Sequence, residues 1–533
     1  METTGAYLSV LKKLPGVAPA AGRRTFKTKL KWTALILFLY FIMTQITVLG
    51  VDQTKVQQFM LYQILLGSKF GSIMTLGIGP IVTASIIIQL LVGSKIINWN
   101  LQTPEGKIKF QGTQKLAAIA LSLIEAVIFV TMGTVTPSSP DLLWLVIAQL
   151  ALGGILVIFM DEVISKWGFG SGVSLFIVAG VAIGIVQGMF NPFANCVTDE
   201  AGAGCLTFGL MLKGGMPSIG IPTATSPPVG LIPLFISMLG SNIVQAFLTL
   251  LPVIATVLVF LLVIYINAIK VEIPLAFGSV RGFGRRWPLK FLYTSNIPVI
   301  LTAALLANVR LIAFSLSKQG MTFLGTFDAN GQATGGLSYF LTPSNSQGLM
   351  GLVIFIGFFF LLGVILAHFT KIKTWKASLV MAVLGGAAWF AVVYSTGLTG
   401  LATIEAIDIA RLFSYAAFMV VGSVIFSIFW TMTSGMDAHS VATQIHSTGM
   451  QIPGFRRDIR IIESVLERYI PSLTVLGGIA VGFLAAFADF TNAIGTGTGI
   501  LLSTMIVYQL YEEIATQHME DMNPALRRFM EKH

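Results

Sequence analysis

The sequence predicts an all-α polytopic membrane protein, and three observations lead to that fold class. Hydrophobic residues make up 55% of the 533 residues and charged residues only 11%, and the mean hydropathy is +0.83. A soluble domain carries roughly 25% charged residues, so this composition excludes a soluble enzyme or nucleic-acid-binding module. Uncharged stretches recur along nearly the whole chain, and a spanning helix needs roughly 20 mainly apolar residues.

Twelve uncharged segments predict about twelve membrane-spanning helices. They are preceded by a basic, amphipathic segment, residues 1–31, which is too long for a cleaved signal peptide. In chain order the predicted spans lie near residues 32–50, 71–94, 116–138, 142–160, 172–190, 248–269, 297–317, 349–367, 377–395, 412–433, 471–489 and 498–511.

The positions of the basic residues predict the orientation. With a cytoplasmic N-terminus, the inside segments hold 27 of the 33 Lys and Arg, and both termini are cytoplasmic. A further crossing by the apolar stretch 231–246 would move 15 of these basic residues outside. We therefore expect that stretch to lie on or partly in the outer leaflet. The external region 191–247 contains Cys196 and Cys205, which form either a disulfide or two free thiols.

Several long motifs carry a resemblance to a known family. They are SIMTLGIGPIVTASIIIQLLVG at 72–93, VEIPLAFGSVRGFGRRWPLKF at 271–291, TSNIPVILTAALLANVRL at 294–311, GFRRDIRIIESVLERYIP at 454–471 and NAIGTGTGILL at 492–502. In this order they resemble the SecY family, the pore-forming α subunits of the protein-conducting channel, in its archaeal form.

The resemblance implies two pseudo-symmetric five-helix halves. The N-terminal half would be 32–190 and the C-terminal half 248–511, followed by a cytoplasmic tail at 512–533. The family has ten spans, so the segments within 349–395 are an inserted helical hairpin. A short internal sequence repeat supports two related halves, because Pro80 is followed by IVTA and Pro298 by VILTA.

The resemblance also implies a ring of apolar side chains at the pore constriction. A narrow apolar neck blocks ions by dewetting while it binds no passing polypeptide tightly. The residues are Ile78, Val82, Val173, Ile177, Ile300 and Leu502. Each of the first two pairs has the spacing i, i+4, which places both members on one helix face. Nearby Gly77, Gly79, Gly170 and Gly172 would let the backbones approach closely.

Below the ring, the family has a short plug. The corresponding stretch here, residues 60–70, is too apolar for a free loop, and an external interfacial helix is the alternative interpretation. The plug residues would be Met60, Leu61, Tyr62, Gln63, Ile64, Leu65, Leu66, Gly67, Ser68, Lys69 and Phe70.

A polar cluster across a lateral gate is a third implication. By resemblance it consists of Thr83, Glu125 and Asn308, with Gln89 as a further member. Polar contacts between membrane helices are worth roughly 1 kcal/mol each, which suits a latch that an entering signal sequence opens; plain helix packing is the alternative. The resemblance gives Arg310 no role.

Two long cytoplasmic segments contain arginines that the resemblance assigns to ribosome docking. These are Arg281, Arg285, Arg286, Arg456 and Arg457. Guanidinium groups bind phosphates of RNA well, although the positive-inside rule alone also explains their sign.

We therefore expect the central pore subunit of a protein translocase in the plasma membrane. It would pass secretory chains across the membrane and release transmembrane segments laterally into the lipid bilayer. The resemblance implies a SecE-like γ subunit and a small β subunit in a heterotrimer, a translating ribosome, and signal sequences and nascent polypeptides as partners. We expect no catalytic residues, metal or cofactor, because the sequence holds no phosphate-binding loop, metalloprotease motif or nucleophile elbow. The alternative is a secondary transporter of a small solute.

Overall fold

The structure is a computed structural model of the chain. The residues it describes are 15–18, 22, 24–51, 68–99, 101, 103–131, 133–195, 219–220, 227–240, 243–277, 284–318, 320–328, 332–344, 346–370, 374–395, 405–447, 450–451 and 458–522.

Five long helices come from the first part of the chain and are here called the N-terminal group. They are α2 (Phe26–Gln45), α4 (Gly79–Gly93), α5 (Pro104–Thr131), α6 (Leu143–Trp167) and α7 (Gly172–Phe190). Helix α4 begins later than the predicted span because residues 71–78 form turns, with Gly77 at φ +52°. Pro80 at the first helical turn fits that start, since its missing N–H has no helical partner there.

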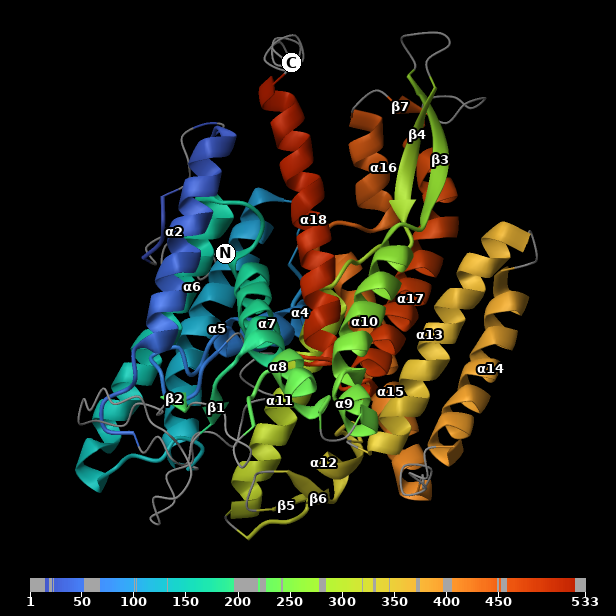
Figure 1. Cartoon of the computed structure of the whole chain (residues 1–533). Coiled ribbons are helices and arrows are strands. Elements are labelled where there is room, and N and C mark those ends of the chain that lie inside the picture. The colour runs from blue at the N-terminus through green and yellow to red at the C-terminus, as the bar shows by residue number, and fades with distance from the viewer. Residues whose placement is uncertain are drawn as a thin grey trace.

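Five further long helices form the C-terminal group, and a pair of helices lies beside it. The group consists of α10 (Leu251–Asn267), α11 (Ile297–Lys318), α15 (Ala406–Thr433), α17 (Ile459–Phe490) and α18 (Gly497–Met522). The pair, α13 (Gln347–Thr370) and α14 (Thr374–Ser395), occupies one edge of the molecule, with α14 outermost (Figure 1). A Cβ on Gly385 would lie 2.7 Å from the carbonyl oxygen of Phe355, so these two helices pack closely.

Each of the twelve predicted segments coincides with one of these helices. Nine helices in the described part of the chain are long and apolar enough to cross a membrane. The other three are α2, which begins among lysines, α4, which has 15 residues, and α18, which ends in acidic residues. The apolar stretch at 231–246 contains α8 (Leu231–Met238) and α9 (Ile243–Thr249). Eight residues of helix span only about 12 Å, too little to cross a membrane.

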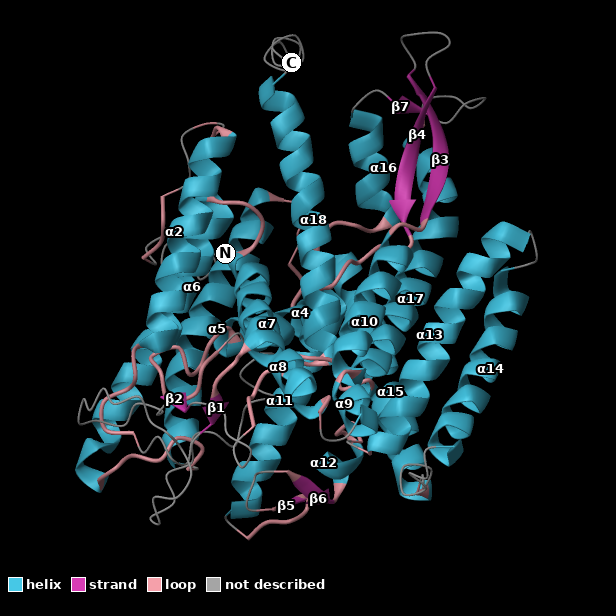
Figure 2. Cartoon of the chain, in the orientation of Figure 1, coloured by secondary structure: helices cyan, strands magenta, loops and turns pink. Residues whose placement is uncertain are grey.

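Short elements connect the long helices (Figure 2). The short helices are η2 (Pro140–Leu142), α12 (Leu337–Phe340) and α16 (Ala438–Ser447). The strands are β1 (Ala194–Asn195), β2 (Ile219–Gly220), β3 (Lys270–Phe277), β4 (Gly284–Lys290), β5 (Thr326–Phe327), β6 (Ala333–Gly335) and β7 (Met450–Gln451).

The predicted cytoplasmic segments 270–296 and 434–470 form one structural unit. They supply an antiparallel sheet of order β4-β3-β7, in which Ala276 of β3 pairs with Gln451 of β7. Buried side chains of the sheet, such as Ile273 and Leu289, share a small hydrophobic core with α16 and the start of α17. The β3–β4 hairpin therefore protrudes as a supported arm at the same end of the molecule as the C-terminus of α18 (Figure 1).

Candidate functional site

The six predicted ring residues lie in one hydrophobic cluster at the centre of the bundle. Ile78 and Val82 come from the start of α4, Ile177 from α7, Ile300 from α11 and Leu502 from α18, and all five are buried. Val173 is partly buried and packs against the same cluster. Four helices of both groups thus meet at an apolar centre, with Ile78 only 1% exposed.

The start of α7 is held by a residue that the sequence analysis missed. Asp161 of α6 accepts a 2.9 Å hydrogen bond from the backbone N–H of Val173 through Oδ1. A Cβ on Gly172 would lie 2.6 Å from Cα of Asp161, so glycine is needed where α7 begins. The signal in the sequence is an acid nine residues before a Gly-Ser-Gly turn. Asp161 therefore fixes the helix end that carries Val173 into the cluster.

A cavity of about 800 Å³ ends at this cluster. Val82, Val173 and Ile300 form part of its lining, together with many polar side chains. The polar lining residues include Ser85, Gln89, Lys107, Gln111, Gln114, Asp161, Ser171, Ser174, Thr433, Ser434, Ser440, Thr443 and Gln444. Several of them belong to the predicted cytoplasmic segments 95–115, 161–171 and 434–470. The cavity, here called the vestibule, thus combines polar side chains from predicted cytoplasmic segments with apolar side chains of the central cluster.

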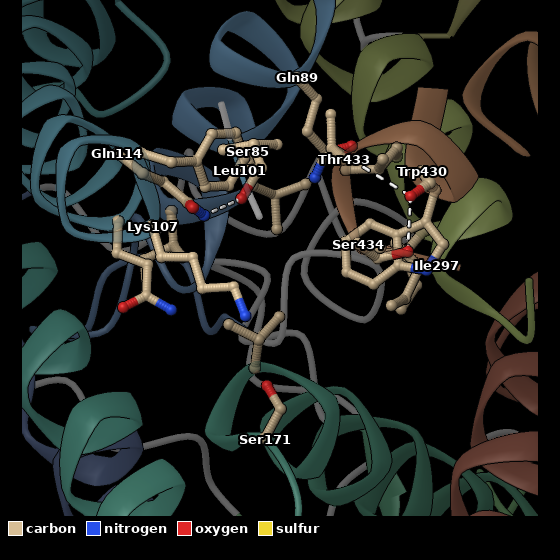
Figure 3. Close-up of a pocket in the computed structure, with 18 of the residues that line it drawn as sticks. Ser85, Gln89, Leu101, Lys107, Gln114, Ser171, Ile297, Trp430, Thr433 and Ser434 are labelled. Atoms are coloured by element: carbon tan, nitrogen blue, oxygen red, sulfur yellow. Dashed lines mark hydrogen bonds between the residues drawn. The ribbon is translucent and has the colours of Figure 1, made fainter. Parts of the chain in front are cut away.

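Opposite walls of the vestibule come from opposite groups of helices. Figure 3 shows Gln114 of α5 hydrogen-bonded to Ser85 of α4 on one wall. On the other wall, Thr433 of α15 and the adjoining Ser434 donate to the carbonyl of Trp430. These hydrogen bonds thus lie within one group of helices or the other, and not between the two groups.

Three of the four predicted gate residues meet between α4, α5 and α11. Asn308 donates a 3.0 Å hydrogen bond through Nδ2 to Oγ1 of Thr83. Glu125 lies within hydrogen-bonding reach of the same hydroxyl. Gln89 lies apart from them, because six residues of helix separate it from Thr83 by about 9 Å along the axis. Its side chain faces the vestibule, and its Oε1 has no hydrogen-bond partner among the described residues.

The same seam continues toward the other end of α11. Leu311 and Phe314 pack in a hydrophobic cluster with residues of α5, such as Phe129. At the end of the helix, Lys318 donates a 2.9 Å hydrogen bond to the carbonyl of Gly133, just beyond α5. The contact between α11 and the N-terminal group thus has a polar centre and a second polar contact at the C-terminal end of α11.

The predicted docking arginines are only partly covered by the described residues. Arg285 and Arg286 lie in β4, opposite Leu275 and Pro274 of β3. Arg281, Arg456 and Arg457 lie outside the described residues. Within the described residues, the sheet joins β4, which carries Arg285 and Arg286, to β3 and β7.

The base of the arm is fixed to the loop after α15. The hydroxyl of Tyr293 donates a 2.7 Å hydrogen bond to the carbonyl of Met436. Burial of the ring, together with the nearby Asp437 carboxylate, raises the pKa of Tyr293 to about 12. The phenol therefore stays protonated and keeps donating throughout the physiological pH range.

Of the predicted plug, the described part is Ser68–Phe70. Phe70 is buried and stacks on Phe129 of α5 at 6.0 Å between ring centroids. Lys69 donates a 3.1 Å hydrogen bond to Oε1 of Gln45 at the end of α2. Residues 60–67, like Cys196 and Cys205, lie outside the described residues.

Comparisons with known proteins agree with this geometry. The SecY family model matches residues 72–511, and the model for the plug domain of Sec61p matches residues 38–71, which include the predicted plug. Protein translocase subunit SecY of Methanothermobacter thermautotrophicus is 41% identical and aligns over 97% of this chain and 96% of its own length. The subunit of the same name from Methanocaldococcus jannaschii is 36% identical over 98% of this chain and 99% of its own length.

Solved structures give the same result. The structure described as "The structure of a protein conducting channel" matches with a TM-score of 0.73 at 36% identity, covering 97% of this chain and 98% of that one. Sec61 in the canine ribosome-channel complex from the endoplasmic reticulum matches with a TM-score of 0.70 at 36% identity, with the same coverage. These matches confirm the predicted all-α polytopic fold and the resemblance read from the motifs. Since the family model and these relatives cover most or nearly all of the sequence, the chain belongs to the SecY family.

Proposed function

We propose that this chain is the pore-forming subunit of a protein translocase. It is a gated channel that passes secretory polypeptides across the membrane and releases transmembrane segments sideways into lipid. The observation that carries this proposal is the vestibule of about 800 Å³, which is lined by polar side chains and by Val82, Val173 and Ile300 of the central apolar cluster. A vestibule of this kind admits a polypeptide without binding it tightly, and an apolar constriction retains ions when the channel is idle.

The gate supports the lateral part of the function. The polar contact between Thr83 and Asn308 joins α4 and α11, which belong to different groups of helices. Separation of these two helices would open the pore toward lipid. A neutral hydrogen bond between membrane helices contributes about 1 kcal/mol, so binding of an apolar signal sequence is strong enough to break it.

A secondary transporter of a small solute is a poorer fit. Such a protein needs ligands for its solute or coupling ion near the membrane centre. Here the centre is a cluster of Ile, Val and Leu, and Glu125 lies in the seam between helices. The relatives are named as translocase subunits, which also argues against that alternative.

The proposed partners are a translating ribosome and two small subunits. The arm formed by β3, β4 and β7 carries Arg285 and Arg286 on β4, and arginines suit the binding of RNA phosphates. A similar protein, canine Sec61, was solved in a ribosome-channel complex. The SecE-like γ subunit, the small β subunit, the plasma-membrane location and the cytoplasmic termini follow from the family and from the charge distribution.

Site-specific crosslinking tests the function directly. A photoreactive residue replaces Ile78 or Ile300, and a ribosome carrying a stalled secretory chain engages the protein in the membrane. We expect crosslinks to the engaged nascent chain. The matched control is Ile87 on α4, which is 40% exposed and faces away from the ring. Absence of crosslinks at both ring positions, with the protein folded and inserted, would contradict the proposal.

A further inference from the structure

Each group of helices contains a similar junction between its fourth and fifth helix. In the N-terminal group these helices are α6 and α7, and in the C-terminal group they are α17 and α18. Each fifth helix begins with a glycine and carries a predicted ring residue five positions later: Ile177 follows Gly172, and Leu502 follows Gly497. Five residues of helix advance only about 7.5 Å, so the position of each helix start determines where the ring side chain lies.

An aspartate near the C-terminal end of the fourth helix holds each of these starts. In the N-terminal group, Asp161 accepts a hydrogen bond from the backbone N–H of Val173. In the C-terminal group, Oδ1 of Asp489 accepts a 2.7 Å hydrogen bond from the backbone N–H of Thr498. Both donors directly follow the first glycine of their helix. An N–H at this position has no partner within its own helix, so the carboxylate supplies one.

Both glycines are required by the close approach of the preceding helix. A Cβ on Gly172 would lie 2.6 Å from Cα of Asp161, and a Cβ on Gly497 would overlap the backbone carbonyl of Ala488, next to Asp489. The two connections differ in length, because acceptor and donor are twelve residues apart in one junction and nine in the other. The shared feature is therefore the contact between the helices and not the loop.

The predicted orientation places the two junctions on opposite sides of the membrane. The segment 161–171 before α7 is predicted to be cytoplasmic, and the segment between the predicted spans 471–489 and 498–511 is predicted to be external. This is the relationship expected for two halves that are related by an axis in the membrane plane.

The turn before α18 is a strained one that its neighbours hold in place. Thr496 has φ +68°, in the left-handed region that β-branched residues seldom adopt. Two residues earlier, the backbone N–H of Ile494 donates a 3.0 Å hydrogen bond to Oγ1 of Thr256 in α10. A strained turn persists only where the surrounding contacts determine it. The bond between Asp489 and Thr498 is such a contact on the other side of the turn.

Asp489 is itself fixed by further hydrogen bonds. Its Oδ2 accepts a 2.5 Å hydrogen bond from the hydroxyl of Tyr415 in α15, a residue only 4% exposed. The hydroxyl of Thr498 donates to the same oxygen. The carboxylate thus has three donors from two helices, and α15 and α17 together determine where α18 begins.

We propose that Asp489 is a positioning residue of the apolar ring. It holds the first turn of α18 against the end of α17 and so places Leu502 at the constriction, as Asp161 places Ile177 through the start of α7. Each half of the molecule thus contributes one aspartate to the closure of the channel. This inference rests on the proposed function, because it takes the ring to be the seal of the idle channel.

The ion conductance of the idle, full-length protein in planar bilayers tests the proposal. Asp489→Ala removes the acceptor oxygens, and Asp489→Asn keeps one of them. The matched control is Asp408→Ala in α15. Asp408 is also only partly exposed and accepts a 2.6 Å hydrogen bond from the hydroxyl of Ser344, but α15 carries no ring residue.

The expected results separate positioning from stability. Asp489→Ala raises the idle conductance several-fold, Asp489→Asn returns it toward the parent level, and Asp408→Ala leaves it unchanged. In a Leu502→Ala background, Asp489→Ala raises the conductance no further, because the side chain that it positions is already absent. Thr498→Val loses the hydroxyl bond but keeps the N–H bond, so it gives an intermediate rise.

Two results would overturn the proposal. In the first, the conductance of Asp489→Ala equals that of Asp408→Ala. In the second, Asp489→Ala raises the conductance by the same factor with and without Leu502, which would mean that it acts elsewhere. If Asp489→Ala does not fold, as judged by thermal unfolding in detergent, Thr498→Val decides, and a conductance at the parent level overturns the proposal.

Failure of the proposed function is a separate outcome. The nascent-chain crosslinks at Ile78 and Ile300 would then be absent, whatever the idle conductance of the variants is.

Discussion

The side-chain amide of Asn308 donates a 3.0 Å hydrogen bond to the hydroxyl of Thr83, joining helices whose contacting residues lie 225 positions apart in the sequence. The Thr83 hydroxyl donates in turn to the carbonyl of Gly79, one turn earlier in its own helix, at 2.9 Å. The acceptor is therefore oriented by α4 itself. A latch of one neutral hydrogen bond suits a gate that substrate binding opens.

Removal of this bond should make the gate easier to open. We expect Asn308→Ala to shift the equilibrium toward the open gate by about 1 kcal/mol, or roughly five-fold. The measurement is translocation, into vesicles containing the purified complex, of a secretory chain whose signal sequence has been shortened. Thr131→Val is the control, because the Thr131 hydroxyl bonds only to Val127 in its own helix. Equal translocation by Asn308→Ala and the parent protein would remove Asn308 from the latch.

Loss of the apolar ring should let ions leak through the idle channel. The double variant Ile78→Gly with Ile300→Gly removes two side chains from the central cluster, which wets the constriction. Conductance in planar bilayers should rise without any substrate. The control carries the same change on the same two helices, at the lipid-exposed positions Ile87 and Ile312. A conductance no higher than that of the control would exclude Ile78 and Ile300 from the seal.

Hydropathy and motif order predicted the spanning helices because lipid burial is a local property of each segment. The Thr83–Asn308 contact was predicted through family resemblance. The pore ring stays a prediction from the same resemblance, since no local pattern distinguishes Ile78 from a lipid-facing isoleucine. The structure brings these ring residues into one cluster.

Other features depend on contacts between distant residues that local patterns do not encode. The sheet pairs Ala276 with Gln451, and the second strand is only two residues long. The carbonyl that accepts a hydrogen bond from Arg310 belongs to Leu341, which lies after a different helix. Gln89 differs from the prediction because the pitch of α4 directs it into the vestibule, away from Thr83.

Charge reversal on the arm should weaken ribosome binding. We expect Arg456→Glu with Arg457→Glu to reduce cosedimentation with ribosomes. The plot of the logarithm of the binding constant against the logarithm of the salt concentration should also become less steep, by roughly one unit of slope for each lost phosphate contact. Arg468→Glu with Lys376→Glu, at exposed positions of α17 and α14, is the control, because it changes the net charge by the same amount. Binding and salt dependence that match those of the control would exclude the docking role.

Asp161 should determine how well the ring closes. Asp161→Ala removes the acceptor for the N–H of Val173, and loss of such a helix-end bond costs about 1–2 kcal/mol. We expect a lower thermal unfolding midpoint in detergent and a raised idle conductance, because Val173 loses its fixed position. Asp161→Asn keeps an acceptor oxygen and should restore both properties. If Asp161→Ala destabilised the protein and left the channel as tightly closed as before, Asp161 would act on stability alone.

The pair Tyr415 and Asp489 should behave as one energetic unit. The Tyr415 hydroxyl donates a 2.5 Å hydrogen bond to Oδ2 of Asp489. We expect Tyr415→Phe and Asp489→Ala each to lower the free energy of unfolding by about 1–3 kcal/mol, because each leaves a buried polar partner unpaired. The double variant removes both partners, so its cost should fall short of the sum by about 0.5–3 kcal/mol. The measurement is unfolding in mixed micelles with increasing denaturing detergent. Tyr415→Phe combined with Glu463→Gln is the control, because Glu463 is also in α17 but pairs with His439. Additive costs for Tyr415 and Asp489, as expected for that control, would mean that the two side chains do not interact.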